Sequence, residues 1–475
     1  MSDQEKQKLH DAAKTRRRFL SDAALLTAAL VGCSANADRV LAPSAPSLDL
    51  SRGDDDDEGE NGLSRPDRSG IEHIVLVMME NRSFDHFFGW LPHADGRQAG
   101  LHFRDAAGVL HATHALAPDF QGCGFADPDH SYSGGRIEFD NGRCDGWLRA
   151  GDNDIYSIGY YERHDLPFLG RAAVDYTACD RYFCGILGPT FPNRFYQHSA
   201  QTDRLSNTLV LSTLPTIWDR LAAGGISAQY YFSDLPFLAL WGPKYTSITR
   251  PVTEFFAAAQ AGTLPAVSFI DPVFGGEDQG TSSDDHPHGD IRVGETFLNN
   301  IYRALSQGPA WENTVLVINF DEWGGFFDHV PPPVAPIPDS DRAVGSDGRI
   351  GFRTPTLVIS PFSRRGHVSH RQFDHTSVLR MIEWRWNLEP LTVRDRTANN
   401  LAMALDLRHP ERHAPQYLVP TVVGATCPVS TAPVASAARF ESDVGASIAT
   451  APQTRRAPWS ALRSMARAHG FAVVG

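Results

Sequence analysis

Residues 71–79, IEHIVLVMM, form the stretch of sequence that decides the fold. This nearly continuous apolar run is typical of a β-strand that is buried on both faces, as in the sheets of α/β proteins. Similar apolar runs recur at residues 266–270, 314–320 and 355–359. We expect all of these segments to be strands of one central sheet.

Helix-like patterns lie between these runs, at residues 213–223, 295–307 and 374–386. Asp374 stands where a side chain can cap the last of them. Strands that alternate with helices predict an α/β fold with a mainly parallel central sheet flanked by helices. Residues 92–185 are rich in glycine, aspartate and aromatic side chains without clear periodicity, so we expect long loop insertions over the carboxyl edge of the sheet.

The composition of the 475 residues argues against several classes of protein. Apolar residues make up 42% and charged residues 21%, so the chain can bury a core. The formal charge of −13 offers no basic field, and we therefore expect no nucleic-acid partner. The absence of a P-loop motif, a Gly-x-Ser-x-Gly elbow and a His-Glu-x-x-His helix argues against P-loop NTPases, ordinary α/β-hydrolases and zincin proteases.

The first 33 residues resemble an export signal. Residues 15–20, TRRRFL, precede an apolar run at 23–31 that is too short for a membrane anchor. Twin arginines before such a run resemble a twin-arginine (Tat) signal, which the Tat translocase reads. We predict export to the periplasm, to the cell surface as a lipoprotein, or to the medium.

Two cleavage sites remain open in this signal. Residues 30–33, LVGC, resemble a lipobox, in which Cys33 is lipidated and anchors the mature chain to a membrane. Residues 35–37, ANA, fit an ordinary cut after Ala37.

The rest of the chain divides into three predicted regions. Residues 34–70 include the acidic run DDDDE, whose self-repulsion predicts a disordered acidic linker. Residues 71–409 carry the strand and helix patterns and form the predicted main domain. Residues 410–475 have weak patterning and are expected to be a peripheral C-terminal appendage.

Either cleavage leaves five cysteines for the folded body. In an oxidising compartment, Cys123–Cys144 and Cys179–Cys184 are the candidate disulfides, which leaves Cys427 unpaired. Sequence spacing does not determine this connectivity. No Cys-x-x-Cys pair indicates a zinc site.

Acidic side chains follow two of the predicted strands. Residues 80–86, ENRSFDH, come after the first strand, and residues 321–329, DEWGGFFDH, come after the run at 314–320. The carboxyl ends of parallel strands lie at one edge of a sheet, so these acids can converge. Their mutual repulsion would be relieved by a divalent cation. The predicted ligands are oxygen donors suited to Ca²⁺, Mg²⁺, Mn²⁺ or Zn²⁺, namely Glu80, Asn81, Asp321 and Glu322. The alternative is that these acids are helix caps and surface ion pairs.

Residues 188–196, GPTFPNRFY, are expected to be a loop that enters a helix, which Pro192 is well placed to open. Thr190 would lie at the positive end of this helix. Its hydroxyl either caps the helix or serves as a nucleophile whose pKa a cation lowers.

Two loops combine histidines with acids: residues 127–131, DPDHS, contain His130, and residues 284–289, DDHPHG, contain His286 and His288. Nearby acids favour the protonated imidazole, which can protonate a leaving oxygen. The alternative is that these histidines are solvated and take no part in chemistry.

Three motifs, in this order, resemble the phosphoesterase family of bacterial and plant non-specific phospholipases C and acid phosphatase A. They are ENRSFDHFFG at 80–89, GPTFPNR at 188–194 and DEWGGFFDHVPPP at 321–333, and the similarity extends over residues 71–405. The resemblance implies an alkaline-phosphatase-like fold and makes residues 71–409 a phosphoesterase catalytic domain.

The resemblance also implies roles for individual residues. One metal ion would be held by Glu80, Asn81, Asp321 and Glu322, with Thr190 as the nucleophile. His130 and His286 would contact the phosphoryl group and the leaving oxygen, although His288 or His329 could serve instead. Residues 374–377, DHTS, also resemble the family and are interpreted as structural.

The prediction is a metal-dependent phosphoester hydrolase, specifically a phospholipase C that cleaves phosphatidylcholine-type lipids through a phosphothreonine. An acid phosphatase acting on soluble monoesters is the alternative with the same core. A non-catalytic surface-binding protein is the third hypothesis. Oligomeric state and metal identity are left open by the sequence.

Overall fold

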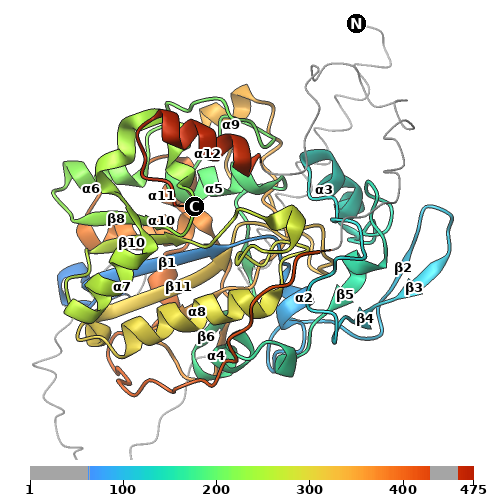
Figure 1. Ribbon diagram of the computed structural model, residues 1–475, viewed down its shortest axis with the longest axis horizontal. Coiled ribbons are helices and arrows are strands. Elements are labelled where there is room, and N and C mark those ends of the chain that lie inside the picture. Colours follow the sequence, from blue (N-terminus) through green and yellow to red (C-terminus); the bar gives the residue numbers. More distant parts are fainter. Residues whose placement is uncertain (1–62, 64, 428–457, 475) are drawn as a thin grey trace, which may run out of the picture. The chain divides into compact units, whose positions relative to one another are not determined.

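The computed structural model describes Leu63, residues 65–427 and residues 458–474 (Figure 1). The predicted export signal, including Cys33, lies outside the described residues, as does most of the predicted acidic linker at 34–70. Within the described part of the chain, no helix combines the length and the apolar character needed to cross a membrane.

An eight-stranded sheet forms the centre of the fold, in the order β13-β6-β12-β11-β1-β10-β8-β9. Strand β1 runs parallel to both of its neighbours, whereas β12 is antiparallel to β11 and β6. The strands of this sheet are β1 (His73–Met79), β6 (Thr177–Cys179), β8 (Ala228–Phe232), β9 (Thr249–Pro251), β10 (Val267–Asp271), β11 (Thr314–Phe320), β12 (Leu357–Ile359) and β13 (His367–Ser369).

Three small two-stranded sheets accompany the central sheet. They pair β2 (His102–Arg104) with β3 (Leu110–Ala112), β4 (His114–Ala115) with β5 (Gly159–Tyr160), and β7 (Tyr182–Phe183) with β14 (Phe373–Asp374). All of them except β14 belong to the stretch 92–185, which also supplies strand β6 of the central sheet. That stretch therefore contributes to the core as well as to loops.

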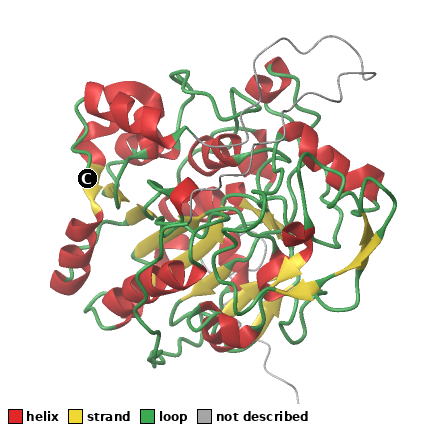
Figure 2. Cartoon of the chain, turned by 45° about the vertical axis from the view of Figure 1, so that its right-hand side comes forward, coloured by secondary structure: helices red, strands yellow, loops and turns green. Residues whose placement is uncertain are grey.

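Helices cover both faces of the central sheet (Figure 2). The α-helices are α2 (Phe84–Phe88), α3 (Tyr132–Phe139), α4 (Leu169–Asp175), α5 (Thr190–Ser199), α6 (Ile217–Ala223), α7 (Val252–Ala261), α8 (Ile291–Ser306), α9 (Asp339–Ala343), α10 (His375–Trp386), α11 (Val393–Thr397) and α12 (Trp459–Ala468). 3₁₀ helices occur at Pro66–Arg68, Asp140–Gly142, Ile155–Ile158, Arg163–Asp165, Phe237–Ile248, Glu277–Gln279, Trp311–Asn313 and Leu401–Ala404.

Alternate residues of the strands point to opposite faces, which produces two hydrophobic layers. Ile74 and Leu76 pack with helices α5, α6, α10 and α12, whereas Val75 and Val77 pack with α2, α4, α7 and α8. Because both faces are covered, the central strands are apolar at nearly every position.

The predicted fold class is confirmed. Each of the four predicted strand runs overlaps an observed strand, and each of the three predicted helices overlaps an observed one. The Asp374 side chain accepts a hydrogen bond from the backbone N–H of Thr376 (2.7 Å), so it caps α10 as expected. The antiparallel strand β12 explains why the sheet is mainly rather than wholly parallel.

Of the predicted C-terminal appendage at 410–475, residues 428–457 lie outside the described part. The described residues on either side contribute to the core. Tyr417 stacks on Tyr302 with ring centroids 5.2 Å apart, and Trp459 and Leu462 are buried beside α5 and the 3₁₀ helix at Phe237–Ile248.

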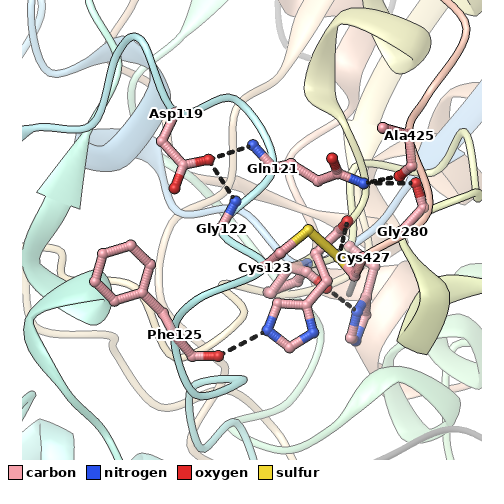
Figure 3. The surroundings of a disulfide bond; sticks show 11 residues. Asp119, Gln121, Gly122, Cys123, Phe125, Gly280, Ala425 and Cys427 are labelled. Carbon is pink, nitrogen blue, oxygen red and sulfur yellow. Dashed lines mark hydrogen bonds between the residues drawn. A yellow bond between two sulfur atoms is a disulfide. The ribbon is translucent and has the colours of Figure 1, made fainter. Parts of the chain in front are cut away.

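The predicted disulfide pairs are wrong, because Cys123 is bonded to Cys427 (Figure 3). Cys144, Cys179 and Cys184 are buried free thiols. Cys179 lies on β6 inside the central sheet, where its side chain packs in the hydrophobic core instead of facing a nearby cysteine. Proximity in the sequence was therefore a poor guide to pairing, and the observed bond joins segments 304 residues apart.

Candidate active site

The predicted metal ligands lie side by side because the strands that carry them are neighbours. In the parallel pair β1–β11, Met79 is opposite Phe320, so Glu80 and Asn81 leave the sheet next to Asp321 and Glu322. All four side chains are fully buried. The backbone N–H of Asn81 donates to Asp321 Oδ1 (3.1 Å), which links the two strand ends directly.

The Asn81 side chain joins the acids to a histidine. When its amide is oriented to suit its neighbours, Nδ2 donates to Glu322 Oε1 (2.6 Å) and to Asp321 Oδ1 (3.2 Å). The amide oxygen then accepts a hydrogen bond from His286 Nε2 (2.9 Å). Asn81 has a φ of 58°, a left-handed conformation that asparagine tolerates better than most residues.

Two glycines make room for this arrangement. Gly324 and Gly325 both have positive φ values, 65° and 71°. A Cβ atom at Gly324 would lie 2.1 Å from the Asn81 carbonyl oxygen, and one at Gly325 would lie 2.6 Å from Pro128 Cβ. The glycine pair after β11 therefore lets the strand-end loop pass close to Asn81 and to the loop that carries His130.

Three buried carboxyl groups lie close together in this cluster. Burial, followed by the charge of Asp321, raises the pKa of both Glu80 and Glu322 well above the usual value, and burial raises the pKa of Asp321 to about 6. Among the described residues, Glu80 Oε2 and Asp321 Oδ2 have no hydrogen-bond partner. Buried carboxylate oxygens without a donor are costly unless a cation compensates them. The donor set therefore fits a hard or borderline divalent cation.

Arg194 supplies part of the compensation, and its role was not foreseen from the sequence. Its guanidinium pairs with Glu80 Oε1 (2.8 Å) and Asp271 Oδ1 (2.9 Å) and lies 3.7 Å from Asp321 Oδ2. Arg194 belongs to the motif GPTFPNR, so the sequence did place it near the candidate site. One guanidinium facing several carboxyl groups cannot balance all of them once they are ionised.

Thr190 is the first residue of α5 and lies one helical turn before Arg194. Residues four apart share a face of a helix, so Thr190 stands on the face of α5 from which Arg194 reaches the acids. Pro189 occupies the N-cap position, and the backbone N–H of Phe191 donates instead to Asn207 Oδ1 (2.8 Å), so the structure does not support the capping role of Thr190. The neighbouring backbone is held by Asn193, whose Nδ2 donates to Gly188 O (2.7 Å).

His130 and His286 lie next to each other beside the acids. Their rings meet edge to face with centroids 6.0 Å apart, and His130 Nε2 is 3.8 Å from Glu322 Oε1. Nδ1 of each ring pairs with a nearby carbonyl oxygen, Pro128 O for His130 (2.8 Å) and Pro287 O for His286 (2.9 Å). Burial lowers the pKa of His286 to about 3, so desolvation outweighs the nearby acids that were expected to favour the protonated form.

The loop that carries His286 is shaped by its own polar residues. Asp284 Oδ1 accepts hydrogen bonds from Ser282 Oγ (2.7 Å) and from the backbone N–H of His286 (2.9 Å). The Asp284 carbonyl oxygen accepts from the backbone N–H of Glu80 (2.7 Å). These bonds tie the histidine loop to the end of β1.

The other candidate histidines are engaged elsewhere. His288 Nε2 pairs with Phe125 O (3.0 Å). His329 lies between Asp85 (2.6 Å) and Asp95 (3.0 Å), in an ion-pair network with Arg353. His375 Nε2 pairs with the Asp321 carbonyl oxygen (2.7 Å), which agrees with a structural role for the segment 374–377.

A further carboxylate, Glu277, enters the site without having been predicted. Ligand atoms of Glu277, Glu80 and His286 all lie within 4.8 Å of one another. No motif surrounds Glu277 in the sequence, so only the tertiary structure reveals it.

Comparisons with known proteins agree in pointing to one family. A profile of the Phosphoesterase family matches residues 71–389. Phospholipase C B of Mycobacterium tuberculosis is 34% identical over 391 residues, which cover 67% of this chain and 74% of that protein. Phospholipase C A of the same organism is 31% identical over 433 residues, covering 75% and 81%. Non-specific phospholipase C1 of Arabidopsis thaliana is 30% identical over 397 residues, covering 73% of each chain.

Two solved structures align with the chain at a TM-score of 0.34. One is the phosphonate monoester hydrolase of Agrobacterium radiobacter, with 11% identity and coverage of 67% of this chain and 74% of that one. The other is a protein of the alkaline phosphatase superfamily from Vibrio parahaemolyticus, with 8% identity and coverage of 69% of each chain.

Proposed function

The chain belongs to the Phosphoesterase family, and from this premise we propose that it is a metal-dependent phospholipase C that cleaves phosphatidylcholine-type lipids. Membership makes it a hydrolase of ester bonds. Its relatives in Mycobacterium tuberculosis and Arabidopsis thaliana are named phospholipases C, which supports the choice of substrate class. The observation that carries the proposal is the convergence of Glu80, Asn81, Asp321 and Glu322 on one buried point beside His286.

Those four residues would hold the cation. A divalent cation bound there supplies a Lewis acid for the phosphoryl oxygens and lowers the pKa of a bound hydroxyl. Arg194 limits the repulsion among the acids through its ion pairs with Glu80 and Asp271, and it anchors α5 against the strand ends.

Thr190 is the proposed nucleophile. Its Oγ forms a bond to phosphorus while the bond from phosphorus to the diacylglycerol oxygen breaks, which gives a phosphothreonine. The proton of the Thr190 hydroxyl, whose pKa a cation at this site would lower, passes to solvent, and His130 protonates the departing alcohol. His286 keeps its Nε2–H on the Asn81 amide oxygen and so orients that residue. Water then attacks the phosphothreonine and releases the phosphorylated head group.

The test compares phosphatidylcholine vesicles with p-nitrophenyl phosphate, each with chelator-treated protein and after Ca²⁺, Mg²⁺, Mn²⁺ or Zn²⁺ is restored. We expect release of phosphocholine that depends on the restored cation. Turnover of the soluble monoester alone would instead support the acid phosphatase, and turnover of neither would support a non-catalytic binding protein.

Export by the Tat translocase, with Cys33 lipidated, is proposed on the signal-like residues 15–33. Mass spectrometry of the mature N-terminus tests both parts of this proposal. A chain that retains residue 1 in the exported fraction would contradict it.

A further inference from the structure

We propose that Trp459, from the last described helix, holds Glu277 in place as an additional carboxylate of the cation site. This inference rests on the proposed function, because it assigns Glu277 to the same buried site. It joins two residues that lie 182 positions apart in the sequence.

Glu277 is buried in a short 3₁₀ turn that follows β10. Its Oε2 lies 3.9 Å from His286 Nε2, and its ligand atom lies within 4.8 Å of those of Glu80 and His286. The two carboxylates supply oxygen donors of the kind that suit Mn²⁺, Zn²⁺ or Ca²⁺, while His286 Nε2 remains on the Asn81 amide oxygen. Glu80 belongs to the same group, and its Oε2 has no hydrogen-bond partner among the described residues.

The other oxygen of Glu277 is held by Trp459. The indole Nε1–H of Trp459 donates a hydrogen bond to Glu277 Oε1. The indole also stacks on Phe274, with centroids 4.1 Å apart and planes 7° apart, and contacts the ring of Phe191, the residue after Thr190. Trp459 therefore touches both the loop that carries Glu277 and the start of α5.

A second contact fixes helix α12 to the same loop. Arg463 Nη2 pairs with Asp234 Oδ2 (2.6 Å). Asp234 also accepts hydrogen bonds from the backbone N–H groups of Phe274 (3.2 Å) and Gly275 (2.8 Å). Asp234 therefore binds both helix α12 and the loop before Glu277, which holds the Trp459 indole and this loop in a fixed relation.

This geometry is that of a residue which orients a metal ligand. A hydrogen bond to one carboxylate oxygen fixes the direction of the other, and loss of such an outer partner typically lowers metal affinity or activity by about 10- to 100-fold. Trp459 is a positioning residue in this account, because it acts through Glu277. The C-terminal helix consequently contributes to the active centre as well as to the core.

The experiment measures the affinity of the full chain for Mn²⁺, Zn²⁺ and Ca²⁺, each alone, by competition with a chromophoric chelator. Glu277→Gln keeps an acceptor for the indole but loses the charge, and we expect a loss of affinity of about 10- to 100-fold. Trp459→Phe keeps the stacking on Phe274 but loses the donor, and we expect a loss of about tenfold.

The matched control is Trp311→Phe. Trp311 is buried to the same degree as Trp459, and its Nε1–H donates to the Arg412 carbonyl oxygen (3.0 Å), away from the acids. This variant loses an equivalent hydrogen bond and should bind the cation with wild-type affinity. Thermal unfolding of the metal-free proteins checks that each variant folds, and Glu277→Asp replaces Glu277→Gln if the latter does not.

The double variant Trp459→Phe/Glu277→Gln separates positioning from a general structural effect. If Trp459 acts through Glu277, the double variant binds the cation as weakly as Glu277→Gln alone. Additive losses, or wild-type affinity in the Glu277 variants, would overturn the proposal. Affinity is measured without turnover, so a chain that needs Glu277 for binding but hydrolyses no phosphoester would contradict only the proposed function.

Discussion

Two regions of the molecule build the candidate site in different ways. Glu80, Asn81, Asp321 and Glu322 leave adjacent strands, and the parallel pairing of β1 with β11 places them. His130, His286 and Glu277 come from loops, and contacts between distant segments place them. The difference teaches that the acidic half of the site is fixed by the core, whereas the histidine half depends on tertiary links.

The loop region is cross-linked at several points. The bond between Cys123 and Cys427 joins the loop before His130 to the C-terminal segment, and Cys427 N–H donates to Gln279 O (2.8 Å). Gln121 Nε2 donates to Gly280 O (3.0 Å) and to Ala425 O, as Figure 3 shows. No comparable cross-link is needed at the strand ends, because the sheet ladder already holds them.

The largest effect on turnover is expected when the proposed nucleophile itself is removed. Thr190→Ala removes the proposed nucleophile, and turnover should fall by about 10⁴-fold or more. The strand-end acids remain, so metal content should equal that of the wild type. Steady-state kinetics and elemental analysis measure the two quantities, and a variant that retains more than a few per cent of activity would remove Thr190 from its role.

A smaller loss of turnover is expected when a histidine of the loop region is replaced. His130→Gln should lower kcat by about 10²- to 10⁴-fold, because a proton donor to the leaving group is lost while the strand-end ligands stay. His409→Gln is the control, because His409 is exposed and pairs with Asp406 at the surface. Equal kcat in the His130 variant and the control would exclude His130 from catalysis.

The convergence of the strand-end residues could be predicted from sequence, because a buried apolar run indicates a parallel strand and the carboxyl ends of such strands share one edge of the sheet. Local patterns singled out Thr190 and the two histidines as candidates, and the motif resemblance implied their roles. Arg194 lay inside a recognised motif, but its ion pairs depend on how α5 packs. Glu277 and Trp459 could not be predicted, because a hydrogen bond between segments 182 residues apart leaves no local pattern.

The disulfide was mispredicted for a related reason. The short spacing between neighbouring cysteines suggested disulfides that close short loops. The observed disulfide instead joins Cys123 to Cys427, two segments that become neighbours only after the chain folds. Cys179 forms no disulfide, because it lies on β6, a strand of the central sheet. Loops were expected in this part of the chain from its sequence.

The smallest effect on turnover is expected when the loop cross-link is opened. Cys123→Ser/Cys427→Ser should lower stability by about 2–5 kcal/mol. Turnover should fall less than in the His130 variant, because hydrogen bonds still hold the loops, and saturating cation should still bind the strand-end acids. Cys144→Ser is the control, since Cys144 is a free buried thiol. Loss of bound cation in the double variant, together with its retention in the control, would show that the strand ends also depend on the cross-link.

The most direct test of the central claim is the divalent metal content of Asp321→Asn, measured by elemental analysis beside the wild-type chain. The account predicts that the wild type binds a divalent cation when it is supplied, and that the variant retains less than about a tenth of that content and loses turnover with it. Wild-type metal content in the variant would contradict the claim that the paired strand ends hold the cation.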